Sequence, residues 1–350
     1  MGKKLFDYVI GNPPYQEEFT SEGNKTYAAP VYNLFMDATN EVGEKVELIH
    51  PARFLSNAGS TPKAWNRKML NDPHFKVLRY EEDASRVFPN TDIKGGVAIT
   101  YHDSKKNFGA IKVFTKYEEL NRILQKVVEN SHFKFVDMTS IVVTRTAYRM
   151  TDKMHEDHPE ALSQLSNGHA YDMSTNIFDR LPQIFFDADQ NDGHEYVRIL
   201  GRENNTRIYK FMRRDYLNNV INFDKFKIFV PKANGNGTYG EIITQPVISD
   251  PHIGSTESFL SIGIFETREE VENCLKYIST KFCRSLLGIL KTTPDLTPEK
   301  FQYVPLQDFT ANSDIDWTKS IREIDQQLYR KHGLDEEEIE FIESHVKEMA

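Results

Sequence analysis

The stretch that decides the fold comes early in the chain and reads Phe6-Asp7-Tyr8-Val9-Ile10-Gly11-Asn12-Pro13-Pro14-Tyr15. Its first half is a short run of β-branched and aromatic residues, which predicts a strand buried on both faces of a sheet. Gly11 ends the run, and Pro13 and Pro14 then fix two successive φ angles and remove two N–H donors. The sequence therefore predicts a buried strand that leads into a rigid turn, whose carbonyl groups have no neighbouring donor to occupy them.

The polar groups of this turn suit a reaction on the exocyclic amino group of a nucleobase. The side-chain oxygen of Asn12 and the main-chain oxygen of Pro13 are two fixed acceptors, which together accept both amino hydrogens. Positive charge that develops on the nitrogen during its attack then meets preorganised negative dipoles. Tyr15 offers a flat ring on which the base stacks. The base first has to leave the duplex, because its reactive atom is inaccessible within the stack.

Asn-Pro-Pro-Tyr after an apolar strand resembles the catalytic motif of the DNA amino-methyltransferases, especially the adenine-specific enzymes. Val46–Leu55 resembles the next strand of that family and the turn after it. Val87–Asn90, followed by Gly96–Thr100, resembles the later motif whose Phe packs against the flipped adenine. The alternative is a proline-rich turn with a purely structural role. The resemblance implies catalytic roles for Asn12, Pro13, Pro14 and Tyr15, stacking of the base between Tyr15 and Phe88, and S-adenosylmethionine as the methyl donor.

The first 130 residues alternate between strand-like and helix-like patterns. Such alternation is typical of an α/β sheet, which binds its ligands at the carboxyl ends of its strands. The Asn12–Tyr15 turn stands at one of these ends. A polar loop at residues 16–27 follows it, which we expect either to close over the base or to be an ordinary surface loop. We expect helices at 30–44, 62–70 and 117–128, and strands at 6–10, 45–49, 75–80, 95–101 and 108–114.

The character of the sequence changes near Asn130, where we place a domain boundary. Residues 225–306 are similar to the target-recognition region of restriction-modification methylases that carry the Asn-Pro-Pro-Tyr motif. The resemblance implies a partial Rossmann-like methyltransferase sheet in residues 1–130, followed by an α+β target-recognition domain in residues 131–350. In the second part we expect strands at 141–144, 184–186, 226–230, 242–248 and 258–265, and helices at 268–290, 317–332 and 336–348, the last with Asp335 as its N-cap.

The net charge of −9 does not indicate a general nucleic-acid binder, so any DNA contact has to come from local clustering of basic residues. One such cluster, interleaved with aromatic residues, lies between Tyr196 and Lys232. Basic and aromatic side chains together are what phosphate positioning and base contact require. The alternative is a solvated face of a strand. The predicted DNA-binding residues are Arg198, Arg202, Arg207, Lys210, Arg213 and Arg214.

The sequence departs from the family in its methyl-donor site. Only about 11 residues precede Asn12, too few for the βαβ unit that carries the cofactor loop. Gly235–Gly240 matches G-x-G-x-x-G, but the residues after it favour a strand rather than the required helix, which predicts a hairpin loop. We therefore expect this chain to bind S-adenosylmethionine weakly or not at all by itself, and a second polypeptide to carry the cofactor-binding half.

Other features of the sequence narrow the setting of the protein. No run approaches 18 apolar residues, so we expect no membrane span. Cys274 and Cys283 show neither metal-ligand spacing nor a disulfide framework, which favours a reduced, cytoplasmic setting. His155–His158 lacks the spacing of a helical zinc motif, so we expect a solvated acidic loop there and no metal.

Three interpretations follow from the sequence. The first is a site-specific adenine-N6 DNA methyltransferase chain of a restriction-modification system, which acts on double-stranded DNA beside a restriction endonuclease. The second is a non-enzymatic DNA-binding or specificity subunit, or a methylase remnant. The third, a methyltransferase that acts on RNA or on protein amides, leaves the large β-rich second half unexplained.

Overall fold

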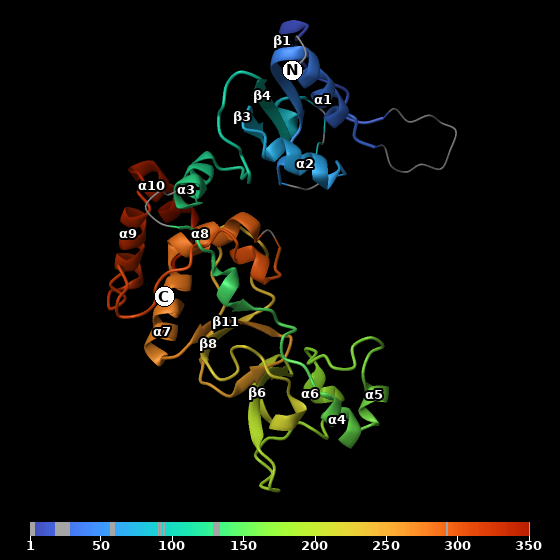
Figure 1. Cartoon of the computed structure of the whole chain (residues 1–350), viewed down its shortest axis with the longest axis vertical. Coiled ribbons are helices and arrows are strands. Elements are labelled where there is room, and N and C mark those ends of the chain that lie inside the picture. Colours follow the sequence, from blue (N-terminus) through green and yellow to red (C-terminus); the bar gives the residue numbers. More distant parts are fainter. Residues whose placement is uncertain are drawn as a thin grey trace, which may run out of the picture. The chain divides into compact units, whose positions relative to one another are not determined.

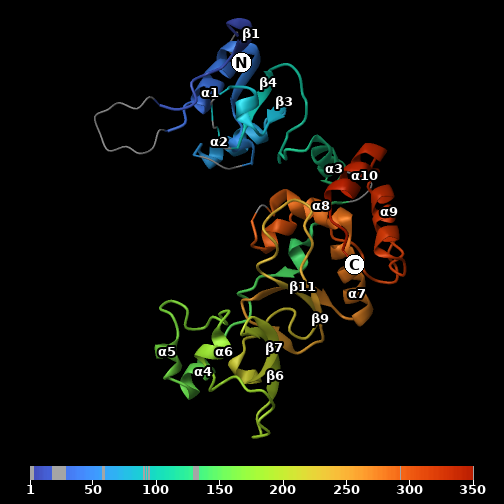
Figure 2. The same ribbon diagram turned by 180° about the vertical axis from the view of Figure 1, so that it is seen from behind.

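The computed structural model of the chain describes residues 4–17, 29–56, 60–89, 91, 93, 95–128, 134–291 and 293–349 (Figures 1 and 2). The chain is a mixed α/β protein with several sheets, divided into two compact units, residues 1–121 and 122–350. This division falls within helix α3 (Glu118–Val128). The residues around Asn130 and most of the predicted 16–27 loop lie outside the described part.

Unit 1 is built on one four-stranded sheet in the order β1-β2-β4-β3. β1 is parallel to β2, and β4 is antiparallel to both β2 and β3. β1, β2 and β3 therefore run in the same direction. The elements are β1 (Phe6–Gly11), α1 (Tyr32–Val42), β2 (Gly43–Pro51), the 3₁₀ helix η1 (Arg53–Ser56), α2 (Lys63–Leu70), β3 (Phe75–Glu81), the 3₁₀ helix η2 (Ala84–Arg86) and β4 (Val97–Asp103).

One face of this sheet is covered by α1 and α2. Met36 from α1 and Met69 from α2 share a buried cluster with Leu48 from β2, Phe75 from β3 and Ala98 from β4. The helices cover the sheet because their apolar residues recur at helical spacing on one side. This cluster is the core of unit 1.

The outer strand β1 has a free edge, because within the described residues it pairs only with β2. Phe6, Tyr8 and Ile10 are 56%, 61% and 75% exposed. They alternate with Val9, which packs against the core, so they belong to the sheet face that α1 and α2 do not cover. The prediction of a strand buried on both faces was therefore wrong for β1, which forms an edge of the described sheet.

Unit 2 contains two further sheets, with strand orders β10-β6-β7 and β5-β11-β8-β9. Its elements are η3 (Met138–Ile141), β5 (Val142–Val143), α4 (Asp152–Asp157), α5 (Ala161–Gln164), α6 (Ile177–Arg180), β6 (Tyr196–Glu203), β7 (Thr206–Arg213), η4 (Arg214–Tyr216), β8 (Phe226–Pro231), β9 (Val247–Ser249), β10 (Ile253–Ser255), β11 (Phe259–Phe265), α7 (Arg268–Ser279), α8 (Lys281–Leu290), η5 (Pro298–Phe301), α9 (Ile321–Lys331) and α10 (Glu336–His345). Among the described helices, none combines the length and the apolar character that crossing a bilayer requires.

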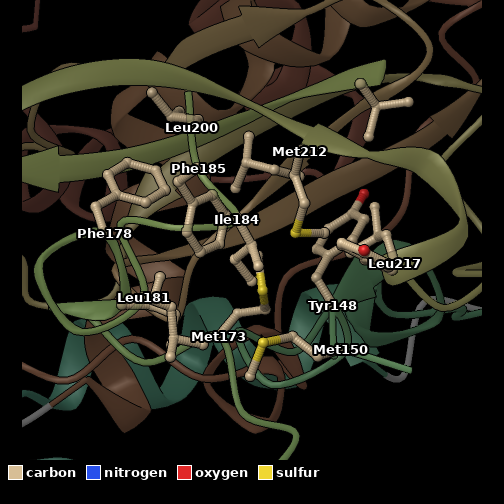
Figure 3. Packing of buried hydrophobic residues seen from close by; sticks show 14 of the residues in the cluster. Tyr148, Met150, Met173, Phe178, Leu181, Ile184, Phe185, Leu200, Met212 and Leu217 are labelled. Carbon is tan, nitrogen blue, oxygen red and sulfur yellow. The ribbon is translucent and has the colours of Figure 1, made fainter. Parts of the chain in front are cut away.

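The core around the β6–β7 hairpin is rich in methionine and aromatic side chains (Figure 3). Leu200 from β6 and Met212 from β7 reach into it, together with Tyr148, Met173 and Phe185 from the preceding segments. Flexible methionine side chains fill the irregular gaps that short helices and loops leave beside a hairpin. Leu200 and Met212 lie on opposite faces of the hairpin, so this packing reaches both of its faces.

Several predicted elements differ in the structure. Residues 108–114 and 184–186 are not strands, and residues 155–157 of the predicted acidic loop belong to helix α4. The predicted helix at 268–290 is two helices, α7 and α8, separated by Thr280 with an extended backbone. β8 and β9 pair antiparallel, so the prediction of a hairpin between them is confirmed, with a second strand shorter than expected. Asp335 caps α10 as predicted.

Candidate active site and DNA-binding face

The Asn12–Tyr15 turn lies at the carboxyl end of the unit 1 sheet. Because β1, β2 and β3 run in the same direction, the turns that follow them leave the sheet at one end, where β4 begins. The main-chain N–H of Ala52, just after β2, donates to the carbonyl of Gly96, just before β4, at 3.0 Å. This end is where an α/β sheet binds its ligands.

Asn12 and Pro13 present free acceptors at this end. Asn12 is exposed and Pro13 is half-buried. Within the described part of the chain, neither the Asn12 side chain nor the Pro13 carbonyl oxygen takes part in a hydrogen bond. Both oxygens are therefore available to an amino group from outside, as the sequence predicted.

Tyr15 is held by its main chain and leaves its hydroxyl unsatisfied. Its carbonyl accepts a hydrogen bond of 3.2 Å from the N–H of Val31, which ties the turn to the start of α1. The hydroxyl is buried and has no partner among the described residues. Burial raises the pKa of Tyr15, so its hydroxyl stays protonated and remains a donor for a bound ligand.

The structure brings Tyr15 and Phe88 together. Their ring centroids lie 6.4 Å apart, with 68° between the ring planes. Phe88 is placed by the turn after η2, where its N–H donates to the carbonyl of Ala84 at 2.8 Å. The rings thus meet edge to face rather than in parallel. A base that stacks between them requires one ring to turn.

Beneath this end of the sheet lies His50, a residue to which the sequence analysis gave no role. Its ring is fully buried and stacks on Tyr32, with centroids 5.7 Å apart and 7° between the planes. Burial lowers the pKa of His50 to about 4, so the ring is neutral. In the tautomer that fits both contacts, Nδ1–H donates to the Pro51 carbonyl (3.1 Å) and Nε2 accepts from the Thr100 hydroxyl (2.8 Å). His50 thereby ties the end of β2 to β4. A polar residue at the end of an apolar strand was the only sign of it in the sequence.

The neutrality of His50 predicts acid sensitivity of unit 1. Its pKa is lower in the folded protein than in the unfolded chain, so its contribution to stability is fully present above pH 6.5 and is lost as the pH falls toward 4. We expect a loss of up to about 3 kcal/mol in the free energy of unfolding. The measurement is urea unfolding at both pH values in a Trp317→Phe background, followed by the fluorescence of Trp65, which lies beside Phe54 in the same core. His50→Gln should lose this pH dependence and His74→Gln should keep it; an identical dependence in all three proteins would contradict the assignment.

The glycine-rich loop at Gly235–Gly240 does not fit a cofactor. The backbone N–H groups of Asn236 and Gly237 donate to the Glu241 carboxylate at 2.9 and 3.3 Å. That carboxylate also pairs with the buried ammonium of Lys291. The amides that would cradle a ligand are therefore occupied from within the chain. Among the described residues we find no other glycine-rich strand–loop–helix turn.

Three of the predicted DNA-binding residues lie together on the β6–β7 hairpin. In its antiparallel register Arg202 is opposite Arg207, and Leu200 is opposite Tyr209. Arg198 lies over the Tyr209 ring, 5.5 Å from its centroid. Burial, and then the charge of Arg202, lower the pKa of Arg207, which shows that the two cations lie close together. Arg198, Arg202 and Arg207 therefore share one side of the hairpin, which we call the arginine face.

The other three predicted residues have partners from this chain, as does Arg207, which donates to the Gln245 carbonyl at 2.6 Å. Lys210 points to the opposite side of the hairpin and pairs with Asp187 at 2.6 Å. Arg213 pairs with Asp215 at 2.5 Å. Arg214 donates to the Leu217 carbonyl at 2.7 Å and also to Asn219. Of these partners, Asp187 lies outside the basic segment, whereas Asp215, Leu217 and Asn219 lie within it.

The arginine face predicts a specific salt dependence. Arg202→Gln should reduce the slope of log affinity for duplex DNA against log salt by nearly one, because one phosphate contact is lost. Lys210→Gln, on the opposite side of the same hairpin, should leave the slope unchanged. Fluorescence anisotropy at several salt concentrations measures both variants. Equal slopes for wild type and Arg202→Gln would place the DNA surface elsewhere.

Comparison with known proteins gives a family for the first part of the chain. Residues 1–88 match the model of the Eco57I restriction-modification methylases. A stretch of 120 residues is 28% identical to a protein described as an uncharacterized adenine-specific methylase from Mycoplasma pneumoniae. The stretch makes up 34% of this chain and 28% of that relative, so the chain spans well under two thirds of the relative's length.

Solved structures of restriction-modification enzymes show a weaker likeness. The type IIG restriction endonuclease BpuSI aligns with 91% of this chain and 48% of its own, at 12% identity and a TM-score of 0.32. The type IIL enzyme MmeI, solved in complex with DNA, aligns with 97% of this chain and 56% of its own, at 10% identity and a TM-score of 0.33. Scores this low decide nothing about this chain. The family model matches residues 1–88, which hold both the Asn12–Tyr15 turn and Phe88. Together with the methylase relative, this match confirms the resemblance to the adenine-specific methylases of restriction-modification systems.

Proposed function

We propose that this chain carries the amino-group site and the DNA-recognition part of a site-specific adenine-N6 DNA methyltransferase. The observation that carries the proposal is the free pair of acceptors on Asn12 and Pro13, beside the Tyr15–Phe88 ring pair, in a segment that matches a methylase family. Both features lie at the end of the sheet where α/β proteins bind ligands.

The chemistry of this chain concerns the adenine amino group. The Asn12 and Pro13 oxygens accept its two hydrogens and draw the nitrogen toward a tetrahedral shape, with its lone pair directed outward. The two prolines hold the Pro13 carbonyl in place before the reaction, and both acceptors stabilise the positive charge that develops on nitrogen. Because the Gly235–Gly240 loop does not fit S-adenosylmethionine, the donor that the family implies, we assign to this chain only the handling of the amino group.

Recognition of double-stranded DNA belongs to unit 2 in this proposal. The arginine face supplies cations for phosphates, and Tyr209 beside it supplies an aromatic surface for sugars or bases. Phosphate contacts fix the register and orientation of the protein on the DNA. The choice of the DNA target sequence then rests on other side chains within residues 131–350. A restriction endonuclease that reads the same site is the expected companion.

The free edge of β1 is the proposed docking site for a cofactor-binding segment on a second polypeptide. An edge strand presents unpaired N–H and C=O groups that pair readily with another strand. The apolar side chains of Phe6, Tyr8 and Ile10 on this strand are 56%, 61% and 75% exposed. Burial of these side chains favours docking of an apolar surface. The added segment would place the methyl donor beside the Asn12–Tyr15 turn.

A non-enzymatic DNA-binding subunit is the second candidate. The occupied Gly235–Gly240 loop favours it, because the amides of this loop are not available to a methyl donor. The two candidates differ in one property: only the enzyme needs an adenine to stack at the Asn12–Tyr15 turn.

Base stacking tests this difference. The probe is a single-stranded oligothymidylate with one 2-aminopurine, a fluorescent adenine analogue that needs no extrusion from a duplex. Tyr15→Ala and Phe88→Ala should each weaken its binding by about 1–3 kcal/mol and restore fluorescence that stacking quenches. Tyr101→Ala, a half-buried tyrosine toward the other end of the sheet, is the control. Equal affinity and fluorescence in all four proteins would favour the non-enzymatic subunit.

A further inference from the structure

Arg53 follows β2, the strand that pairs with the strand leading into the Asn12–Tyr15 turn. It begins η1, directly after β2 and Ala52, and it is exposed. β1 and β2 are parallel, with Gly11 opposite Leu48. The residues that follow the two strands, Asn12 on one and Arg53 on the other, therefore leave the sheet at the same end.

The stem of Arg53 is set by the turn before β4. Gly95 has a φ of +86°, and a Cβ at that position would lie 2.6 Å from Cγ of Arg53. Only a glycine there lets the arginine stem lie against the turn without displacement. The hydrogen bond between Ala52 and Gly96 holds the same two segments together. The stem of Arg53 therefore lies against the turn that precedes β4.

The charge of Arg53 acts on Tyr32 of α1. Burial raises the pKa of Tyr32 to about 12, and the nearby Arg53 guanidinium opposes that rise. Tyr32 is the first residue of α1, and the N–H of its neighbour Val31 donates to the Tyr15 carbonyl. At the start of α1, Val31 thus bonds to Tyr15 and Tyr32 senses the charge of Arg53.

Within the described residues, Arg53 has no carboxylate partner, in contrast to many cations of unit 1. Such partners neutralise most of a cation's attraction for an outside anion. An arginine without a carboxylate partner, at the end of a sheet where ligands bind, is available to an anion from outside. The paired cations of unit 1 are Lys68, Arg79, Arg86, Lys105 and Lys116.

We propose that Arg53 binds a phosphate of the nucleotide whose adenine enters the Asn12–Tyr15 turn; this inference rests on the proposed function. A guanidinium matches phosphate geometry with two parallel N–H donors. A base taken out of the stack carries its own backbone with it, and a fixed contact to that backbone holds the base in register with Asn12. Arg53 thereby positions the substrate, and the amino group remains the task of Asn12 and Pro13.

The test is a double-mutant cycle between one side chain and one phosphate. The probe is an eleven-residue oligothymidylate with a central deoxyadenosine, made with normal phosphates or with an uncharged methylphosphonate on either side of the adenosine. On the normal probe, Arg53→Gln should weaken binding about tenfold. A methylphosphonate at the contacted position should weaken wild-type binding by the same factor, and should weaken binding of Arg53→Gln no further. Arg67→Gln, an exposed arginine of α2, is the matched control.

Two results would overturn the assignment of Arg53. In the first, Arg53→Gln and the methylphosphonate weaken binding independently, so that their factors multiply whichever side of the adenosine carries the methylphosphonate. In the second, Arg67→Gln weakens binding as much as Arg53→Gln does. Arg53→Lys, which keeps the charge but loses the second donor, should fall between wild type and Arg53→Gln. If Tyr15→Ala still weakens binding of the adenosine probe but not of pure oligothymidylate, only Arg53 was assigned wrongly. If wild type does not distinguish the two probes at all, the proposed function fails, and this inference fails with it.

Discussion

Replacement of Asn12 by alanine should lower the rate of adenine methylation roughly 10²–10³-fold and leave DNA affinity nearly unchanged. The variant loses one of two fixed acceptors for the amino hydrogens, and the effect belongs to the transition state, where charge on the nitrogen develops. Asn12 is exposed and has no hydrogen bond within the described part, so its removal does not disturb the fold. Single-turnover kinetics, with the donor-binding partner present, measures the chemical step directly.

Two further variants sharpen this result. Asn12→Asp keeps the acceptor oxygen but adds a charge and removes the amide donor, and it should retain more activity than the alanine variant. Asn71→Ala, an exposed asparagine at the end of α2, should retain the full rate. Undiminished methylation by Asn12→Ala would remove Asn12 from the mechanism and return the turn to a purely structural role.

The purified chain should show no micromolar binding of S-adenosylmethionine, and the complementing polypeptide should raise the affinity on the order of 10³-fold, equivalent to about 4 kcal/mol. The free edge of β1 leaves the neighbouring donor site incomplete, so little of the cofactor would be enclosed. Calorimetric titration of the chain, alone and then with its partner, is the measurement. Micromolar binding by the chain alone would reveal a cofactor site within it.

The same experiment tests where the partner docks. Ile10→Lys places a charge on the most exposed apolar side chain of β1 and should block the gain in affinity, because a buried unpaired charge opposes docking. Leu162→Lys is the control, since Leu162 is an exposed apolar residue of unit 2 and 55% accessible. Equal complementation of both variants would place the partner on another surface.

The sequence predicted the sheet of unit 1 well because local patterns and tertiary packing agree there. The apolar runs that precede Asn12 and Arg53 form the parallel strands β1 and β2. Residues 108–114 carry an equally apolar pattern, yet Gly109 and Lys112 adopt positive φ angles of 84° and 57°. Ile111 and Phe114 of that segment pack against the core without a ladder. Apolar periodicity thus reports burial, and burial is not always in a strand.

The break between helices α7 and α8 at Thr280 could not be predicted from the sequence, for a related reason. Apolar residues continue across it, but the Thr280 hydroxyl accepts from the N–H of Cys283 and caps a new helix. Asp325, from α9, accepts from the N–H groups of Lys281 and Phe282 at 3.0 and 2.9 Å. The start of α8 therefore depends on a side chain more than 40 residues away, which no local pattern contains.

The candidate site, like the fold, could be predicted from the sequence only where its features are local. The Asn12–Tyr15 turn could be found because its chemistry lies in consecutive residues. The meeting of Tyr15 with Phe88 was predicted from the resemblance, and the edge-to-face angle of the rings was not. His50 and Arg53 were missed because their significance comes from the end of the sheet at which they lie, and only the strand order shows that.

The most direct test of the central claim is the chemical identity of the base that the Asn12–Tyr15 turn modifies. The chain is produced together with the genes that flank it in cells without adenine methylation, and their DNA is digested to nucleosides for mass spectrometry. We predict N6-methyladenine with the wild-type chain and at least about a hundredfold less with Asn12→Ala. Equal amounts in the two strains, or N4-methylcytosine in place of N6-methyladenine, would contradict the assignment.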